Sequence, residues 1–123
     1  MPARAPSRRG VADRLELAAE LRRLAPQGHD FAEIFRSPTG SLSLTVARWP
    51  AGSVDDQTPH TEDEVYHVVA GRARLVVAGE ETAVGPGSVA FVAAGVDHRF
   101  VEITEDLEVL GFWSPARHTG APR

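Results

Sequence analysis

Two stretches of the sequence gather side chains that bind metal ions. Residues 57–71 contain two histidines and three acids, followed by an apolar run that ends in glycine. Residues 87–98 form a second such stretch, which ends in histidine. Imidazole and carboxylate together are ligands of catalytic divalent metals, and imidazole suits iron, zinc, copper and nickel. We therefore start from the hypothesis that His60, Glu64 and His98 meet around one ion.

Composition restricts the chemistry that such a site could use. The chain has 123 residues, 42% of them hydrophobic and 24% charged, which is typical of one globular domain. It contains no cysteine, so disulfides, zinc–thiolate sites, iron–sulfur clusters and thiol nucleophiles are excluded. All thirteen basic residues are arginine, which excludes lysine Schiff-base chemistry. Any metal must be held by nitrogen and oxygen.

The charge distribution indicates what the protein binds. Residues 1–26 carry six arginines and three acids, whereas the remainder carries seven arginines and fourteen acids. An acidic body disfavours nucleic-acid binding, which depends on clustered basic side chains. No apolar run approaches the roughly 18 residues of a membrane span, and no apolar segment indicates a secretory signal. We expect a cytoplasmic protein whose partner is a small molecule, with no nucleic acid and no membrane.

The pattern along the chain predicts a helix followed by strands. Residues 1–10 are predicted to be a disordered arm, and 11–25 an amphipathic helix that ends before a proline. From 31 to 113 the apolar positions mostly alternate, with turns rich in glycine and proline. This predicts an all-β sandwich or barrel. The tail, 114–123, is predicted to be loose.

Two hairpins are predicted within the barrel. The strand over 65–70 is expected to pair with 72–78 around Gly71, and 97–103 with 107–113. Side chains two apart on a strand share a face. Glu64 therefore lies on the face of Tyr66, with His67 on the opposite face. A carboxylate on an inward face is costly unless it is paired or binds a metal.

At this point the sequence resembles a small single-domain cupin, a member of the cupin superfamily with its conserved β-barrel. The family's motifs run G-x5-H-x-H-x3-E-x6-G and G-x5-P-x-G-x2-H-x3-N. Both spacings occur here without gaps, in the right order, and cover residues 52–102. The corresponding positions are Gly52, Thr58, His60, Glu64 and Gly71 in the first motif, and Gly87, Ala93, Gly95, His98 and Glu102 in the second. Thr58, Ala93 and Glu102 depart from the motifs, which have His, Pro and Asn there.

The resemblance implies a double-stranded β-helix (jelly-roll) barrel with a metal ion near its mouth. His60, Glu64 and His98 fill three of the family's four ligand positions, and Thr58 stands where the fourth has histidine. Gln57 or Thr58 is a candidate fourth ligand. Two histidines and one carboxylate suit Fe2+, with Zn2+, Ni2+ and Mn2+ as alternatives.

For function, we expect a metal-binding protein with dioxygenase-like chemistry on a small organic molecule. The alternatives are a metal-dependent isomerase, lyase or cyclase, and a non-catalytic binding or sensing domain, since a fold does not fix a function. No catalytic residue beyond the ligands is assigned. Small cupins usually dimerise, so the resemblance also implies a homodimer.

Several other polar residues are predicted to lie outside the site. Glu62 is expected in a solvated acidic loop, and His29 and His118 outside the barrel. Arg48 and Arg99 are interpreted as surface ion-pairing residues, with binding of an anionic substrate as the alternative.

Overall fold

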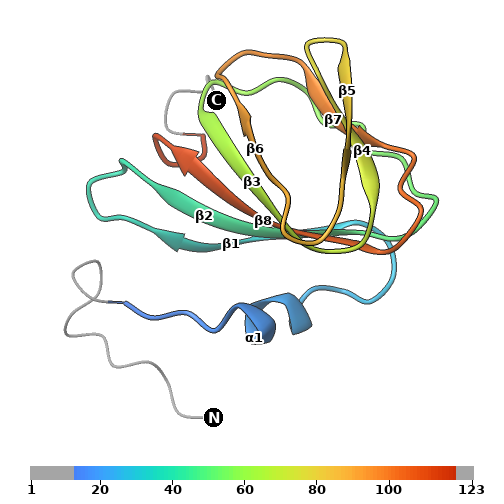
Figure 1. The fold of residues 1–123 in the computed structure, drawn as a ribbon. Helices are drawn as coiled ribbons and strands as arrows, with labels where there is room; N and C mark the ends of the chain where they lie inside the picture. The colour runs from blue at the N-terminus through green and yellow to red at the C-terminus, as the bar shows by residue number, and fades with distance from the viewer. Residues whose placement is uncertain (1–12, 119–123) are drawn as a thin grey trace.

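The computed structural model describes residues 13–118, which form two antiparallel sheets facing each other (Figure 1). Within this range lie one short helix and eight strands: α1 (Leu17–Arg22), β1 (Asp30–Arg36), β2 (Ser43–Trp49), β3 (Asp63–Ala70), β4 (Ala73–Val77), β5 (Glu80–Val84), β6 (Val89–Val92), β7 (His98–Val101) and β8 (Leu107–Ser114). One sheet has the order β1-β2-β8-β3-β6, and the other β5-β4-β7. The all-β jelly-roll architecture with an N-terminal helix is confirmed.

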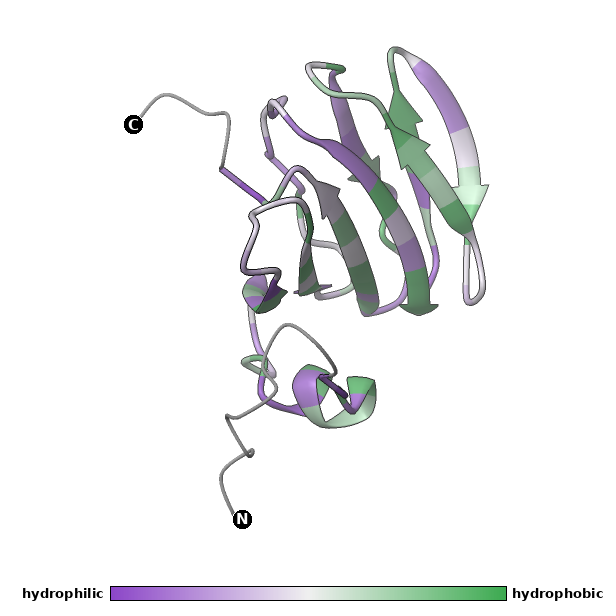
Figure 2. Cartoon of the chain, turned by 90° about the vertical axis from the view of Figure 1, so that its left-hand side faces the viewer, coloured by the Kyte–Doolittle hydropathy of each residue, from purple (hydrophilic) through white to green (hydrophobic). Residues whose placement is uncertain are grey.

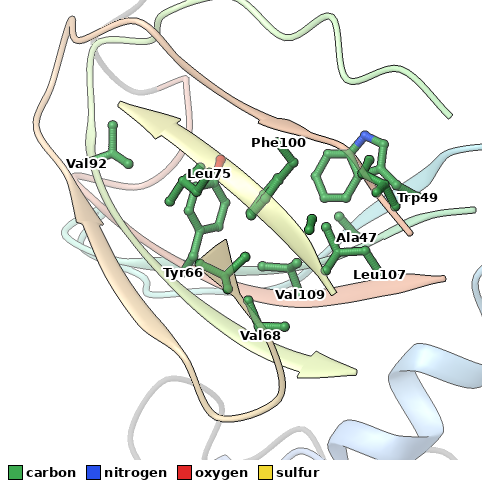
Figure 3. Close-up of a cluster of buried hydrophobic side chains, with 12 residues drawn as sticks. Ala47, Trp49, Tyr66, Val68, Leu75, Val92, Phe100, Leu107 and Val109 are labelled. Atoms are coloured by element: carbon green, nitrogen blue, oxygen red, sulfur yellow. The ribbon is translucent and has the colours of Figure 1, made fainter. Parts of the chain in front are cut away.

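The core lies between the sheets because inward positions alternate along the strands (Figure 3). On β3, Tyr66 and Val68 are buried, while Val65 and His67, which alternate with them, are only partly buried. Phe100 of β7 and Leu75 of β4 meet them from the other sheet. Burial of such large side chains contributes about 1.5–3 kcal/mol each. The prediction that Glu64 shares the inner face of Tyr66 is confirmed, since both are buried.

Both predicted hairpins are wrong. β3 pairs with β6 and β8, whereas β4 pairs with β5 and β7 in the other sheet. The short connections lead the chain from one sheet to the other and pack against each other. A Cβ at Gly71 would overlap the carbonyl oxygen of Asp106, and its φ is +89°. Gly71 therefore marks a crossing of two connections and not a hairpin turn.

The helix is six residues long, much shorter than the range 11–25 that was predicted. Glu16 stands at its N-cap without a side-chain hydrogen bond to the helix, and a proline follows at position 26. So short a helix is marginal by itself and depends on tertiary packing. Leu21 and Leu24 supply that packing, because both are buried against Val46 on the outer face of β2.

Another part of the outer face of the five-stranded sheet carries a row of apolar side chains. The strand register places one residue from each strand in this outer row, in the order Phe35, Leu44, Phe112, Val65 and Phe91. Phe91 is 60% exposed and Phe112 37% exposed. Hydrophobic and hydrophilic bands alternate along the strands in Figure 2, as sheets with two different faces require.

The start of the predicted loose tail is anchored. Ser114 belongs to β8, and Ala116 is fully buried. The backbone N–H of Ala116 donates to the Gly40 carbonyl at 2.9 Å, and that of Arg117 to Ser43 Oγ at 2.9 Å. Residues 119–123 and the predicted N-terminal arm lie outside the described range. Within 13–118, no helix is long and apolar enough to cross a membrane.

Candidate metal centre

The three predicted ligands lie together between the two sheets. His60 is in the loop before β3, Glu64 is on β3, and His98 is the first residue of β7. Glu64 Oε1 lies 3.0 Å from Nε2 of His60 and 3.9 Å from Nε2 of His98. One potential ligand atom from each residue lies within 4.8 Å of the other two. The fold thus brings the two motifs to one point from strands of different sheets.

Hydrogen bonds hold both imidazoles in the tautomer that a metal ligand needs. Nδ1 of His60 donates to the carbonyl oxygen of Glu62 at 3.0 Å, and Nδ1 of His98 to that of Val96 at 2.9 Å. This assignment leaves a lone pair on each Nε2, as in metal sites with oriented histidines. Nε2 of His98 is buried and has no hydrogen-bond partner among the described residues. A buried polar atom without a partner is costly, and a cation would satisfy it.

Glu64 supplies the negative charge of the site. Its side chain is 2% exposed, and burial raises the pKa of Glu64, although His60 and His98 oppose that change. Burial also acts to lower the pKa of His60, but the hydrogen bond and charge of Glu64 outweigh it, so this pKa is raised. A lone pair and a carboxylate 3.0 Å apart repel each other unless a cation lies between them. In the metal-free protein a proton between His60 and Glu64 is that cation, and a divalent ion would replace the proton.

Gly111 on β8 makes room for this carboxylate. It lies opposite Tyr66 on one side and Thr45 on the other. A Cβ at position 111 would stand 2.7 Å from Glu64 Oε2 and 2.8 Å from Thr45 Oγ1. Sequence analysis did not single out this residue. The available signal was an isolated glycine inside an apolar strand, which often marks a close approach.

The candidate fourth ligands lie in the loop before His60. Asp55 is buried and accepts hydrogen bonds from the Phe100 N–H at 2.8 Å and from the Gln57 side-chain amide. Gln57 Oε1 accepts from the Tyr66 hydroxyl at 3.1 Å, so its oxygen is engaged in a hydrogen bond. Burial raises the pKa of Tyr66 well above its ordinary value, which keeps it a hydrogen-bond donor. Thr58 is exposed and lines the cavity described next.

A cavity of about 510 Å³ adjoins two of the three residues. Its walls come mainly from β2, β8 and the loop before β3, with the aromatic and aliphatic side chains of Phe31, Ala47, Trp49, Val109 and Trp113. His60 and Glu64 also line it. The Trp113 ring lies 4.4 Å from the His60 ring, and its Nε1 donates to Thr45 at 2.8 Å. The cavity has the size and apolar character of a small-molecule site.

Glu62 was expected to lie in a solvated loop, but its side chain is completely buried. Its Oε2 accepts a hydrogen bond from Thr61 at 2.7 Å. Its Oε1 lies 3.8 Å from His60 Nδ1 and has no hydrogen-bond partner among the described residues. The loop before β3 folds inward and carries Glu62 with it. Glu62 therefore helps to position the His60 ring.

Two further expectations about the cavity surroundings change. His29 and His118 line the cavity and do not lie apart from it. Arg48 forms an ion pair with the loop before β8 at 2.8 Å, as expected, and Arg99 is exposed. The arginine that lines the cavity is Arg117, which the sequence analysis had assigned to the loose tail.

The match to a known family agrees with this arrangement. Residues 45–113 match the cupin domain family, which is more than half of the chain. The chain belongs to the cupin family. The match covers β2 to β8 and includes all three candidate ligands, so the resemblance inferred from the two motifs is confirmed.

Individual proteins are similar to this chain in sequence or in structure. An uncharacterized protein of Streptomyces coelicolor is 49% identical over 75 residues, covering 61% of this chain and 71% of that protein. An RmlC-like cupin from Shewanella frigidimarina superposes with a TM-score of 0.68 at 21% identity, covering 79% of this chain and 88% of that one.

A chain from the crystal structures of the DMSP lyases RdDddP and RnDddQII is 28% identical, with a TM-score of 0.64. This match covers 77% of the present cupin and 51% of the lyase chain.

Proposed function

We propose that this cupin is a divalent-metal enzyme that acts on a small organic molecule, with His60, Glu64 and His98 as the metal ligands. One observation carries the proposal: two Nε2 lone pairs and a buried carboxylate converge beside a cavity of about 510 Å³. Two histidines and one carboxylate leave open coordination positions, which suits Fe2+ and oxygenase chemistry. We therefore favour iron and a dioxygenase-like reaction.

The residues around a bound ion would have different roles. When bound, the ion supplies a Lewis acid and a template for the substrate. The carbonyls of Glu62 and Val96 hold the two imidazoles in place. Trp113 forms an apolar wall beside His60 and limits the access of water. Thr58 leaves space where the family has a fourth ligand, so more positions remain for substrate.

The experiment is metal analysis of protein purified without an affinity tag or chelator. We expect about one ion per chain, iron being favoured, and loss of the ion when His60 or His98 is replaced by alanine. Oxygen consumption with iron-loaded protein and a panel of small organic acids and phenols tests the reaction class. Full-length protein without any bound ion, even after addition of Fe2+, Zn2+, Ni2+ and Mn2+, would contradict the proposal.

A lyase is the second candidate, because a chain from the DMSP lyase structures is 28% identical over most of this cupin. The same three ligands would serve a metal-dependent lyase, isomerase or cyclase, none of which consumes oxygen. Turnover with zinc, nickel or manganese and no loss of oxygen would favour this class. A non-catalytic binding or sensing domain is the remaining alternative, and ligand binding without any turnover would favour it.

We also propose that the protein is a homodimer. The outer row defined above exposes apolar side chains across the five-stranded sheet, and apolar patches of this kind commonly mark association surfaces. Burial of the row against a second copy would remove Phe91 and Phe112 from water.

A further inference from the structure

The guanidinium of Arg117 has no hydrogen-bond or ion-pair partner among the described residues. Its guanidinium takes part in no hydrogen bond among residues 13–118, and no carboxylate of that range lies within 4.0 Å of it. Burial lowers the pKa of Arg117, while Glu33, Glu62 and Glu64 oppose this from farther away. An arginine remains charged in proteins and offers five N–H donors. These donors are therefore available to a ligand.

Hydrogen bonds hold the backbone of Arg117, and aromatic contacts hold its side chain. Its N–H donates to the fully buried Ser43, and its carbonyl oxygen accepts from Arg36 at 2.6 Å. The guanidinium carbon lies 4.4 Å from the centre of the Phe31 ring and 5.6 Å from that of Trp113. Aromatic contacts hold a guanidinium flat while leaving its edge free for hydrogen bonds.

The cavity connects this cation with the candidate metal centre. Arg117, Trp113 and His60 all line it. Trp113 contacts both ends, since its ring centre is 4.4 Å from that of His60 and 5.6 Å from the guanidinium carbon. The guanidinium carbon is thus at most about 10 Å from the His60 ring centre, the sum of these distances. A small molecule with two functional groups could span that distance.

With a divalent ion bound, the charges that line the cavity favour an anion. Glu64 is its one carboxylate and Arg117 its one arginine, among the described residues. A divalent ion at His60, Glu64 and His98 would more than offset the charge of Glu64. The rest of the protein is acidic, so a positive cavity would distinguish its ligand from the surface around it.

We propose that the ligand of this cavity is a small organic carboxylate, with Arg117 binding its carboxylate group. The proposal rests on the function proposed above in placing the other end of the ligand at the metal centre. Its apolar body would lie between Phe31 and Trp113 on one side and the aliphatic wall of β2 and β8 on the other. Planar carboxylates match the fork of a guanidinium, which gives two parallel hydrogen bonds.

The test compares 3-phenylpropanoate with its neutral amide on metal-free protein. Removing the metal with a chelator leaves Arg117 as the carboxylate-binding group. Both tryptophans of the chain line the cavity, so their fluorescence reports binding. We expect the carboxylate to bind at least about ten-fold more tightly than the amide, the factor of one charge-assisted hydrogen bond. Arg117→Gln should remove this preference without changing amide binding, and Arg117→Lys should retain part of it.

Arg99→Gln is the matched control, because Arg99 is exposed and does not line the cavity. It should bind both compounds as the wild type does. The proposal is wrong if 3-phenylpropanoate does not bind, or binds the wild type no more tightly than the amide. This comparison needs no variant and holds even if Arg117→Gln does not fold. Metal titration of Arg117→Gln should be unchanged, which separates this result from failure of the metal proposal.

Discussion

Gly111→Ala tests whether the packing around Glu64 determines metal binding. A Cβ at this position would lie 2.7 Å from Glu64 Oε2, whereas ordinary contacts begin at 3.4 Å. To restore an ordinary contact the carboxylate would have to move by about 0.7 Å, the difference between these distances. Gly111 is not among the residues with positive φ, so its backbone can accept alanine. The substitution thus acts through space in the site and not through backbone strain.

A shift of this size exceeds what a binding site tolerates. Functional side chains must hold their positions to within about 0.5 Å. Removing a group that orients a ligand typically weakens metal binding by about 10–100-fold, or about 1.4–2.8 kcal/mol. The free energy of unfolding of the metal-free protein changes separately. Gly→Ala gains about 0.4–1 kcal/mol through the unfolded chain, and overpacking costs about 1–3 kcal/mol, so a net loss of about 0–2.6 kcal/mol is expected.

The assay is competition between the protein and a chelator for the metal, with thermal unfolding of the metal-free protein measured in parallel. Gly85→Ala is the matched control. Its Cβ would stand 2.8 Å from a guanidinium nitrogen of Arg72, the far end of a flexible side chain away from the site. Metal affinity should therefore fall only in Gly111→Ala. A folded Gly111→Ala protein with wild-type metal affinity would refute our account of how Glu64 is positioned.

Four further predictions follow from the site and the sheet surface. Glu64→Gln and His98→Ala should both lose the ion, while His67→Ala, on the opposite face, should keep it; metal stoichiometry decides this. Metal-free Glu64→Gln should melt at the same temperature or higher, because burial raises the pKa of Glu64 even against His60 and His98, so the charge of this carboxylate costs stability. Thr58→His should tighten metal binding by adding a fourth ligand, and an unchanged affinity would show that this side chain does not face the ion. Light scattering should give a dimer for the wild type and a monomer for Phe112→Asp. A monomer mass for the wild type at roughly tens of micromolar protein would exclude the dimer.

The sequence by itself pointed to the candidate ligands His60, Glu64 and His98, because the spacing within each motif is local. His60 and Glu64 are four residues apart, and the period of two on a strand sends Glu64 inward with Tyr66. The same alternation, with turns of glycine and proline, indicated an all-β barrel. The cost of an unpaired inward carboxylate then made a cation-binding site the natural interpretation. These inferences required no knowledge of which strands pair.

Tertiary structure decided which strands meet. Gly71 looked like a hairpin turn, yet it leads from one sheet to the other, since burying two inner faces against each other outweighs a local pairing. Gly111 and Arg117 gained their roles only through this topology. One gives space to a carboxylate far away in sequence, and the other is brought to the cavity by hydrogen bonds between 116–117 and the β1–β2 hairpin. Contacts between distant segments depend on the packing of the whole chain, so the spacing of residues within a motif does not predict them.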